Sequence, residues 1–154
     1  MDYTYQIYRL SAQFAKDYPS SQYPELLHKN NRPYTCLLIE TKEDYFICVP
    51  FRSDINHNNA YLFKNSVRSR SKKSGLDYSK IVIIKDNSYL DNGSAVVDAD
   101  EYAEMVTNIN KIVNDVNNYV TTYIDHIKGV HVLHPRQYNR LYKYSSLPYF
   151  NKFF

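Results

Sequence analysis

A short polar segment in the first half of the chain combines groups that can handle phosphate and protons. The segment Pro50–His57 holds a guanidinium, a hydroxyl, an amide and an imidazole, on Arg52, Ser53, Asn56 and His57. RNA is cleaved without a metal ion when its 2′-hydroxyl attacks the adjacent phosphate, so that a protein has only to move protons and stabilise negative charge. These side chains suit that reaction. They equally suit an ordinary polar loop in which His57 caps a backbone group.

Other catalytic chemistries find less support in the sequence. The carboxylates are scattered, no Cys-x-x-Cys or His-Glu-x-x-His pattern occurs, and the three glycines form no phosphate-binding loop. His131 and His134 have a spacing that allows contact with a metal, but two histidines alone are a weak signal. No nucleophile elbow surrounds any serine. We therefore expect neither a metal site nor a cofactor.

The composition is that of a folded chain with a high aromatic content. Hydrophobic residues make up 44% and charged residues 23% of the 154 residues, which predicts one domain spanning residues 1–154. The chain has 17 tyrosines, 7 phenylalanines and no tryptophan. Aromatic rings stack on unpaired bases, although biased codon use in a genome rich in A and T would yield as many tyrosines.

Charge is unevenly distributed along the chain. The net charge is only +3, yet the run Lys64–Lys73 contains five basic residues and no acidic one, while Asp86–Glu104 is strongly acidic. A local basic run is typical of a phosphate-contacting surface, and also of a solvated loop.

Nothing in the sequence indicates secretion or a membrane. Cys36 and Cys48 lie in apolar runs and form no disulfide framework. The first ten residues lack the pattern of a secretion signal, and no segment approaches the roughly 20 apolar residues that span a bilayer. We expect a cytoplasmic protein without membrane contact.

The polar segment follows a predicted β-hairpin. The apolar runs Tyr34–Glu40 and Tyr45–Val49 indicate two strands, and Pro50 should end the second because proline has no N–H for a ladder. Ile81–Ile84 predicts a third clear strand and Ser94–Val97 an edge strand. Loops held by such strands are where chemistry usually occurs.

A long amphipathic helix is predicted over Ala99–Lys128. Asp98 and Glu101 form a capping-box pattern at its start, and Gly129 suits its end. Such a helix would be about 45 Å long, longer than a domain of this size is wide, so we expect either a break near Asn114–Asn118 or an overhanging end. Strands followed by helices predict an α+β domain with an antiparallel sheet.

The C-terminal part is again basic and aromatic. A short helix over Pro135–Tyr144 would place Arg136 and Arg140 on one face, four residues apart.

Four segments carry a resemblance to a known family. They are Asn31–Pro33, Val49–Asn59, Phe63–Lys64 and Gly75–Lys80, the last just before an apolar strand. In order and spacing they resemble the endoribonuclease toxins of type III toxin–antitoxin systems, the ToxN and AbiQ group, and most closely its CptN/TenpN branch. The resemblance runs from about residue 1 to the long helix.

The resemblance implies a fold, a substrate and a partner. The fold would be a strongly twisted antiparallel sheet, partly closed like the small barrel of the MazF and Kid toxins and flanked by helices. The substrate would be cellular or phage mRNA rather than DNA, cut at adenine-rich sites to leave 2′,3′-cyclic phosphate and 5′-hydroxyl ends. The partner would be a repetitive RNA antitoxin with pseudoknot units, processed by the toxin and held in a closed protein–RNA assembly.

The resemblance also adds site residues. Arg32 takes the place of a family lysine, and His28 that of a family tyrosine, while Ile55 and Asn56 stand where the family has a lysine and an aromatic residue. The catalytic set would thus be Ser53, His57, Arg32, Arg52, His28 and Asn56. Candidate RNA contacts are Lys29, Tyr34, Lys64, Arg68, Arg70, Lys72, Lys73, Lys80, His134, Arg136, Tyr138 and Arg140.

Two other functions remain open from the sequence. The first is a regulatory protein that binds RNA through the same basic and aromatic surface without cutting it. The second is a structural or protein-interaction domain built on the long helix, for which RNA affinity should be absent.

Overall fold

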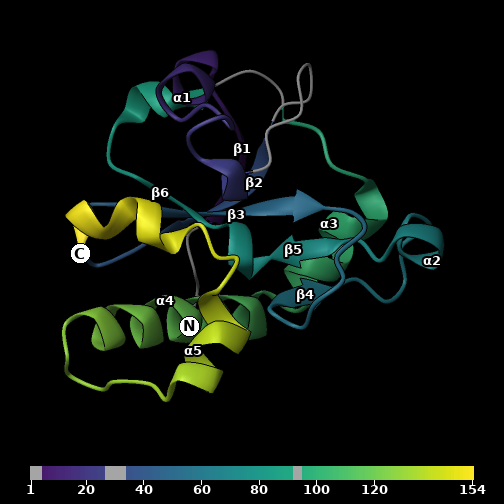
Figure 1. Ribbon diagram of the computed structural model, residues 1–154. Coiled ribbons are helices and arrows are strands. Elements are labelled where there is room, and N and C mark those ends of the chain that lie inside the picture. Colours follow the sequence, from purple (N-terminus) through teal and green to yellow (C-terminus); the bar gives the residue numbers. More distant parts are fainter. Residues whose placement is uncertain (1–4, 27–33, 92–94) are drawn as a thin grey trace.

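The computed structural model describes residues 5–26, 34–91 and 95–154, which form an α+β fold with a seven-stranded antiparallel sheet (Figure 1). The expected fold class is therefore confirmed. The strands are β1 (Tyr5–Leu10), β2 (Thr35–Glu40), β3 (Phe46–Arg52), β4 (Ala60–Leu62), β5 (Gly75–Asp77), β6 (Val82–Ile84) and β7 (Leu90–Asp91). The helices are α1 (Ala12–Asp17), α2 (Ser69–Lys72), α3 (Ala99–Thr107), α4 (Ile109–Ile127) and α5 (Pro135–Tyr142). Short 3₁₀ helices are η1 (Pro24–Leu26), η2 (Tyr78–Lys80), η3 (Asn87–Tyr89) and η4 (Leu147–Phe153).

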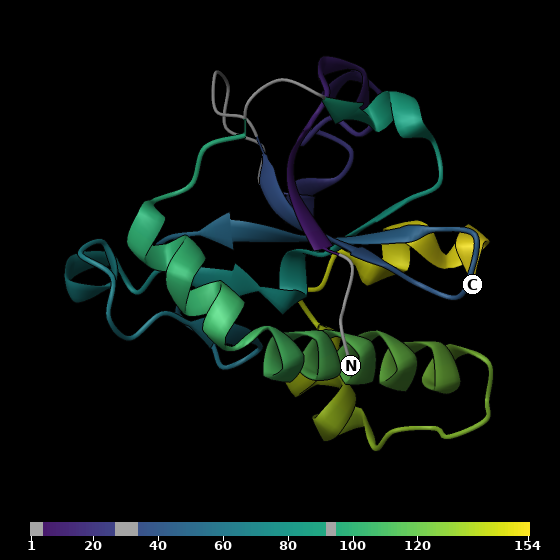
Figure 2. The ribbon, with the colours of Figure 1, turned by 180° about the vertical axis from the view of Figure 1, so that it is seen from behind.

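The sheet is twisted but open. Its strands follow the order β4-β5-β3-β2-β1-β7, with β6 also paired to β3. Figures 1 and 2 show β1 and β2 rising steeply away from the direction of β3. Within the described residues no pairing joins β4 to β7, so the expected partly closed barrel is not formed. A barrel needs its two end strands to meet, and here each of them is only two or three residues long.

The prediction that Pro50 ends the second hairpin strand is wrong. β3 continues to Arg52, and Pro50 lies opposite Cys36 of β2. The reason is a change of partner along β3, which pairs with β6 over Phe46–Cys48 and with β5 over Phe51–Arg52. Pro50 falls between these two sets of pairs, where a missing N–H interrupts neither ladder.

The predicted edge strand at Ser94–Val97 is also misplaced. Residues 95–97 have no regular structure, and residue 94 lies outside the described part. The edge is formed earlier, where Leu90–Asp91 pairs with Arg9 and Leu10 of β1. The other predicted strands agree with β2, β3 and β6 apart from shifts of one to three residues at their ends.

The long predicted helix is broken into two helices, but at a different residue from the predicted one. α3 and α4 are separated at Asn108 rather than near Asn114–Asn118, and the Asn108 side chain donates to the carbonyl of Glu104 at 2.8 Å. Gly129 has φ 71°, which confirms it as the left-handed residue after the helix.

The capping box at the start of α3 does not form. Asp98 is the N-cap residue but makes no side-chain capping bond. Glu101 is buried, with 1% of its surface exposed, and accepts hydrogen bonds from Ser66, Ser74 and Arg68 instead. A tertiary contact thus replaces the local one that the sequence predicted.

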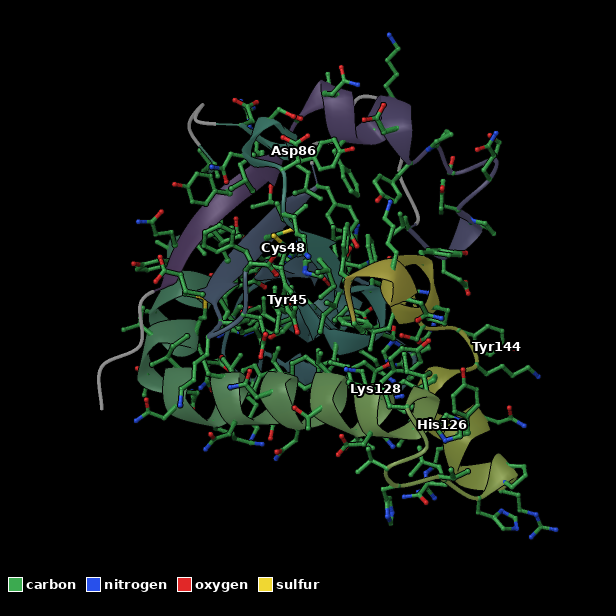
Figure 3. The ribbon with its side chains drawn as sticks, turned by 90° about the vertical axis from the view of Figure 1, so that its left-hand side faces the viewer. Tyr45, Cys48, Asp86, His126, Lys128 and Tyr144 are labelled. Atoms are coloured by element: carbon green, nitrogen blue, oxygen red, sulfur yellow. The ribbon has the colours of Figure 1, made fainter. Side chains whose placement is uncertain are left out.

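One part of the core lies between the sheet and α4, which runs below β3 in Figure 1, and the same core includes Phe14 of α1, Leu26 of η1 and Phe150 of η4. The buried side of α4 consists of Ile112, Val113, Val116, Tyr119, Val120 and Tyr123. α5 packs against α4 through Tyr142, which is 2% exposed and lies 4.8 Å from Tyr119 between ring centroids. Cys48, inside the sheet in Figure 3, and Cys36 are both free and buried. No helix in the described ranges has both the length and the apolar content required to cross a bilayer.

Candidate active site at the end of strand β3

The polar segment after β3 is a loop anchored at its centre. Ile55 is buried, and the backbone N–H groups of Asp54 and Ile55 donate to the carbonyls of Lys72 and Lys73 at 2.6 and 3.2 Å. Asp54 has φ 58°, in the left-handed region that aspartate tolerates better than most residues. These contacts fix the loop against the end of α2, so the polar side chains on either side of Ile55 start from a fixed backbone.

A close approach of two backbones sets the position of β5, which ends at Asp77. Gly75 stands in register with residues of both β3 and β4. A Cβ atom at Gly75 would lie 2.1 Å from the carbonyl oxygen of Tyr61, so only glycine fits there. Asp77 then caps η2, because its Oδ1 accepts from the backbone N–H of Ser79 at 3.0 Å.

The carboxylate of Asp77 is the centre of the site. Asp77 is fully buried, and its Oδ2 accepts from Nη1 of Arg52 at 3.0 Å. Its Oδ1 accepts from the hydroxyl of Ser79 at 2.6 Å and lies 3.2 Å from Nε2 of His57. The structure thus brings together two residues of the predicted catalytic set, Arg52 and His57, through an aspartate.

Asp77 carries a negative charge at neutral pH. Burial alone would raise its pKa, but hydrogen bonds from His57 and Ser79 and the electrostatic attraction of His57 and Arg52 lower it further than burial raises it. The net result is a pKa below the ordinary aspartate value. An ionised carboxylate at this position attracts the guanidinium and the imidazole and holds both in place.

The hydrogen bonds of His57 define which ring nitrogen holds its proton. Nδ1 accepts from the backbone N–H of Asn59 at 3.1 Å. Because an amide N–H can only donate, the proton of the neutral ring is on Nε2. Nε2 faces Asp77 at 3.2 Å and the hydroxyl of Ser79 at 3.3 Å. In this arrangement Nε2 is the donor of His57, and both ring nitrogens have protein partners.

Arg52 and Ser53 keep free hydrogen-bonding capacity. Arg52 uses only Nη1 for Asp77, and 26% of its side-chain surface is exposed. Ser53 is partly exposed, and in the described part of the chain its hydroxyl has no hydrogen-bond partner. A guanidinium and an adjacent free hydroxyl are suitable donors for a phosphate group.

The remaining predicted catalytic residues contribute less to this cluster. Asn56 is exposed on the same loop. His28 and Arg32 lie outside the described residues, as does Lys29 of the predicted RNA contacts.

Two predicted RNA contacts are internal to the protein. Lys80 is 6% exposed, and its Nζ donates to the carbonyl of Tyr144 at 2.6 Å and lies 3.4 Å from Glu25. Burial lowers the pKa of Lys80, although Glu25 opposes this. The Tyr34 hydroxyl donates to the carbonyl of Lys80 at 2.5 Å, and burial, the nearby thiol of Cys36 and the nearby charge of Asp77 raise its pKa well above the ordinary tyrosine value. Both polar groups are therefore engaged in contacts within the protein.

The basic run Lys64–Lys73 divides into one paired residue and several exposed ones. Arg68 donates to Glu101 through Nη2 at 2.7 Å and Nε at 3.3 Å. The other basic residues of the run are exposed and form no ion pair within the described residues, and they are Lys64, Arg70, Lys72 and Lys73. Only these four side chains are therefore available for a polyanion.

The α5 residues form a second basic surface. His134, Arg136 and Arg140 are exposed. His134 caps the helix by accepting from the backbone N–H of Arg136 at 3.1 Å, whereas Tyr138 stacks on His126 with ring centroids 4.6 Å apart. Figure 3 shows Tyr144 at the outer edge of the segment that follows α5, and 64% of its surface is exposed.

No group of three or more His, Cys, Asp or Glu side chains is placed to hold a metal ion in the ranges that the structure describes.

Asp77, Ser79 and Asn59 are site residues that the sequence analysis did not assign. Asp77 and Ser79 lie in the Gly75–Lys80 segment, where an aspartate two residues before a serine is a known turn-capping pattern. That pattern predicts the bond to the Ser79 backbone. It gives no indication that Arg52 and His57 converge on the same carboxylate, because β3 and β5 have to be paired first.

Comparison of this chain with protein-family models, with curated proteins and with solved structures gives no match.

Proposed function

We propose that this protein is an endoribonuclease that cleaves RNA without a metal ion, with its active site at the end of β3. The observation that carries the proposal is the convergence of Arg52 and His57 on the buried, ionised carboxylate of Asp77. Ser53, with a free hydroxyl, directly follows Arg52 in the chain. This cluster supplies positive charge and hydrogen-bond donors, which stabilise the extra negative charge of a phosphate under attack.

In this proposal the 2′-oxygen of the substrate bonds to the neighbouring phosphorus and its proton passes to water. The bond to the 5′-oxygen breaks, and that oxygen takes up a proton from water. The products are a 2′,3′-cyclic phosphate and a 5′-hydroxyl. Arg52 neutralises the developing charge with its remaining N–H groups, and Ser53 donates to a non-bridging oxygen. For His57 to donate to the phosphate through Nε2, as neutral imidazole does when it polarises an oxygen in other enzymes, this N–H would first have to leave Asp77 and the hydroxyl of Ser79. For His57 to act as a base, Nδ1 would first have to release the backbone N–H of Asn59.

The biological setting in the proposal is a type III toxin–antitoxin system. The support is the resemblance of Val49–Asn59 and Gly75–Lys80 to the ToxN and AbiQ toxins, and these two segments supply Arg52, His57 and Asp77. A likeness of the twisted sheet to MazF and Kid belongs to the same proposal. The inhibitor would be a repetitive pseudoknot RNA, whose isolation with the purified protein as a discrete repeat would support this setting.

The test is incubation of the purified protein with adenine-rich RNA in EDTA. We expect cleavage with cyclic phosphate and 5′-hydroxyl ends, and none when every 2′-hydroxyl is methylated. Ser53→Ala and His57→Ala should each lower the rate about 100-fold. Asn58→Ala is the matched control, because Asn58 is exposed on the same loop and its side chain makes no hydrogen bond within the described residues. Equal cleavage rates for the unmodified protein and the three variants would show that the active site is not at the end of β3.

One observation favours a second function, a regulatory protein that binds RNA without cutting it. Both ring nitrogens of His57 already have protein partners, so the site can hold a phosphate without transferring a proton. In the same assay this function predicts that RNA is bound and recovered intact. Cleavage of RNA with unmodified 2′-hydroxyls excludes it.

A further inference from the structure

Asn59 connects three elements of the candidate site through its backbone and its side chain. Its backbone N–H donates to Nδ1 of His57 at 3.1 Å. Its carbonyl accepts from the backbone N–H of Tyr78 at 3.0 Å. Its side-chain Nδ2 donates to the carbonyl of Arg140 at 3.1 Å and lies 3.4 Å from the carbonyl of Leu141. The imidazole, the η2 turn and the end of α5 therefore meet at one residue.

The first two bonds orient the imidazole relative to its partners. Tyr78 stands between Asp77 and Ser79, the two residues that face Nε2 of His57. The backbone of Asn59 thus binds Nδ1 of the ring directly. Through Tyr78 it also binds the turn that carries the two partners of Nε2. A shift of Asn59 would change both distances together.

The side-chain bonds anchor Asn59 to α5. Arg140 and Leu141 belong to the last turn of α5, where carbonyl groups have no partner within the helix. Both atoms can only accept, so the amide of Asn59 must turn its nitrogen toward them. The hydroxyl of Tyr119 donates to the Leu141 carbonyl at 2.7 Å, so the end of α5 is itself fixed to α4.

We propose that Asn59 is a positioning residue that keeps His57 in the form with its proton on Nε2. The side chain fixes the loop to the end of α5, and the backbone N–H then faces Nδ1 and excludes a proton from it. This inference rests on the proposed ribonuclease function for its kinetic consequence, while the protonation state of His57 is a property of the protein alone.

The test compares Asn59→Ala with Asn58→Ala. Asn59→Ala removes the two side-chain contacts to α5 and keeps the backbone N–H, whereas Asn58 is the exposed neighbour. Long-range ¹H–¹⁵N NMR distinguishes a ring protonated on Nε2 from one protonated on Nδ1. We expect the Nε2 form in the unmodified protein and in Asn58→Ala, and a mixture of both forms in Asn59→Ala. Asn59→Asp, which keeps the shape but places an acceptor against two carbonyls, should give the same mixture.

In the RNA cleavage assay, kcat of Asn59→Ala should fall about 10- to 100-fold with little change in KM, because the imidazole is misplaced while the phosphate-binding groups remain. Signals of His57 that are unchanged in both Asn59 variants would overturn the proposal. The two hypotheses fail separately. If the NMR change is seen but the protein never cuts RNA, the positioning role of Asn59 stands and the ribonuclease function is wrong. If the Asn59 variants cut RNA as fast as the unmodified protein, the ribonuclease function stands and the positioning role of Asn59 is wrong.

Discussion

Two buried carboxylates, Asp77 and Glu101, each pair with an arginine but differ in their other partners. Glu101 of α3 accepts from the hydroxyls of Ser66 and Ser74 at 2.9 and 2.6 Å and pairs with Arg68. All of these donors come from the segment of residues 66–74. Asp77 instead accepts from donors of separate segments, the end of β3, the loop that follows it, and η2.

The arginines show the difference most clearly. Arg68 directs both Nη2 and Nε at Glu101, so the pair closes the basic segment into a fixed shape. Arg52 uses one nitrogen for Asp77 and keeps the others, and Asp77 also holds an imidazole with 36% of its side chain exposed. A buried carboxylate paired with arginine is therefore not by itself a sign of chemistry. Free donor capacity and a titratable, exposed partner distinguish the Asp77 cluster.

The largest expected effect is on stability, at Glu101. Glu101→Gln places an uncharged amide among three donors and leaves Arg68 without its partner, so the free energy of unfolding should fall by about 3 kcal/mol. Urea denaturation at pH 7 measures it. Asp98→Ala is the matched control, because Asp98 begins the same helix but makes no capping bond, and should change stability by less than about 0.5 kcal/mol. Equal losses of unfolding free energy in the two variants would contradict this account and would indicate that Asp98 and Glu101 form the predicted capping box.

The next effect, at Asp77, depends on pH. The pKa of Asp77 lies below its ordinary value in the folded protein, so its charge stabilises the fold above the unfolded pKa, and this stabilisation is lost as pH falls through the folded pKa. Asp77→Asn should therefore reduce the free energy of unfolding by about 2 kcal/mol at pH 7, less than at Glu101, because Arg52 donates to Asp77 through one nitrogen whereas Arg68 donates to Glu101 through two. The difference from the unmodified protein should shrink below about pH 4. A difference that is the same at pH 7 and pH 3 would show that Asp77 is not held as a carboxylate.

These two carboxylates also mark the limit of what the sequence predicts. The hairpin, the strand near Ile81–Ile84 and the amphipathic helices follow from apolar periodicity, which depends only on neighbouring residues. Glu101 matches a capping box equally well, and only the distant Ser66 and Ser74 decide against it. Pro50 was misread for the same reason, because the partners of β3 change at a point that no local pattern reveals.

The candidate site divides in the same way. Arg52, Ser53 and His57 are recognised as a set because they are close in the sequence and chemically suited to phosphate. Asp77 is 20 or more residues away from each of them, and its role arises from the pairing of β3 with β5 at Arg52 and Gly75. Long-range pairing of strands is the step that the sequence alone does not supply.

The smallest effect separates Arg68 from its exposed neighbour Arg70. If the basic segment contacts RNA, Arg70→Ala should weaken binding of single-stranded RNA and reduce the slope of log K against log salt by about 0.7, the value for one lost phosphate contact. Arg68→Ala should leave that slope unchanged, since its guanidinium is directed at Glu101, and should lower stability instead. Filter binding between 50 and 300 mM salt, over which the Debye length falls from about 14 to about 6 Å, resolves the two slopes. A reduced slope for Arg68→Ala with an unchanged free energy of unfolding would mean that Arg68 leaves Glu101 to bind RNA. Arg68 would then be as available to a phosphate as Arg52, and the contrast between the two carboxylates would fail.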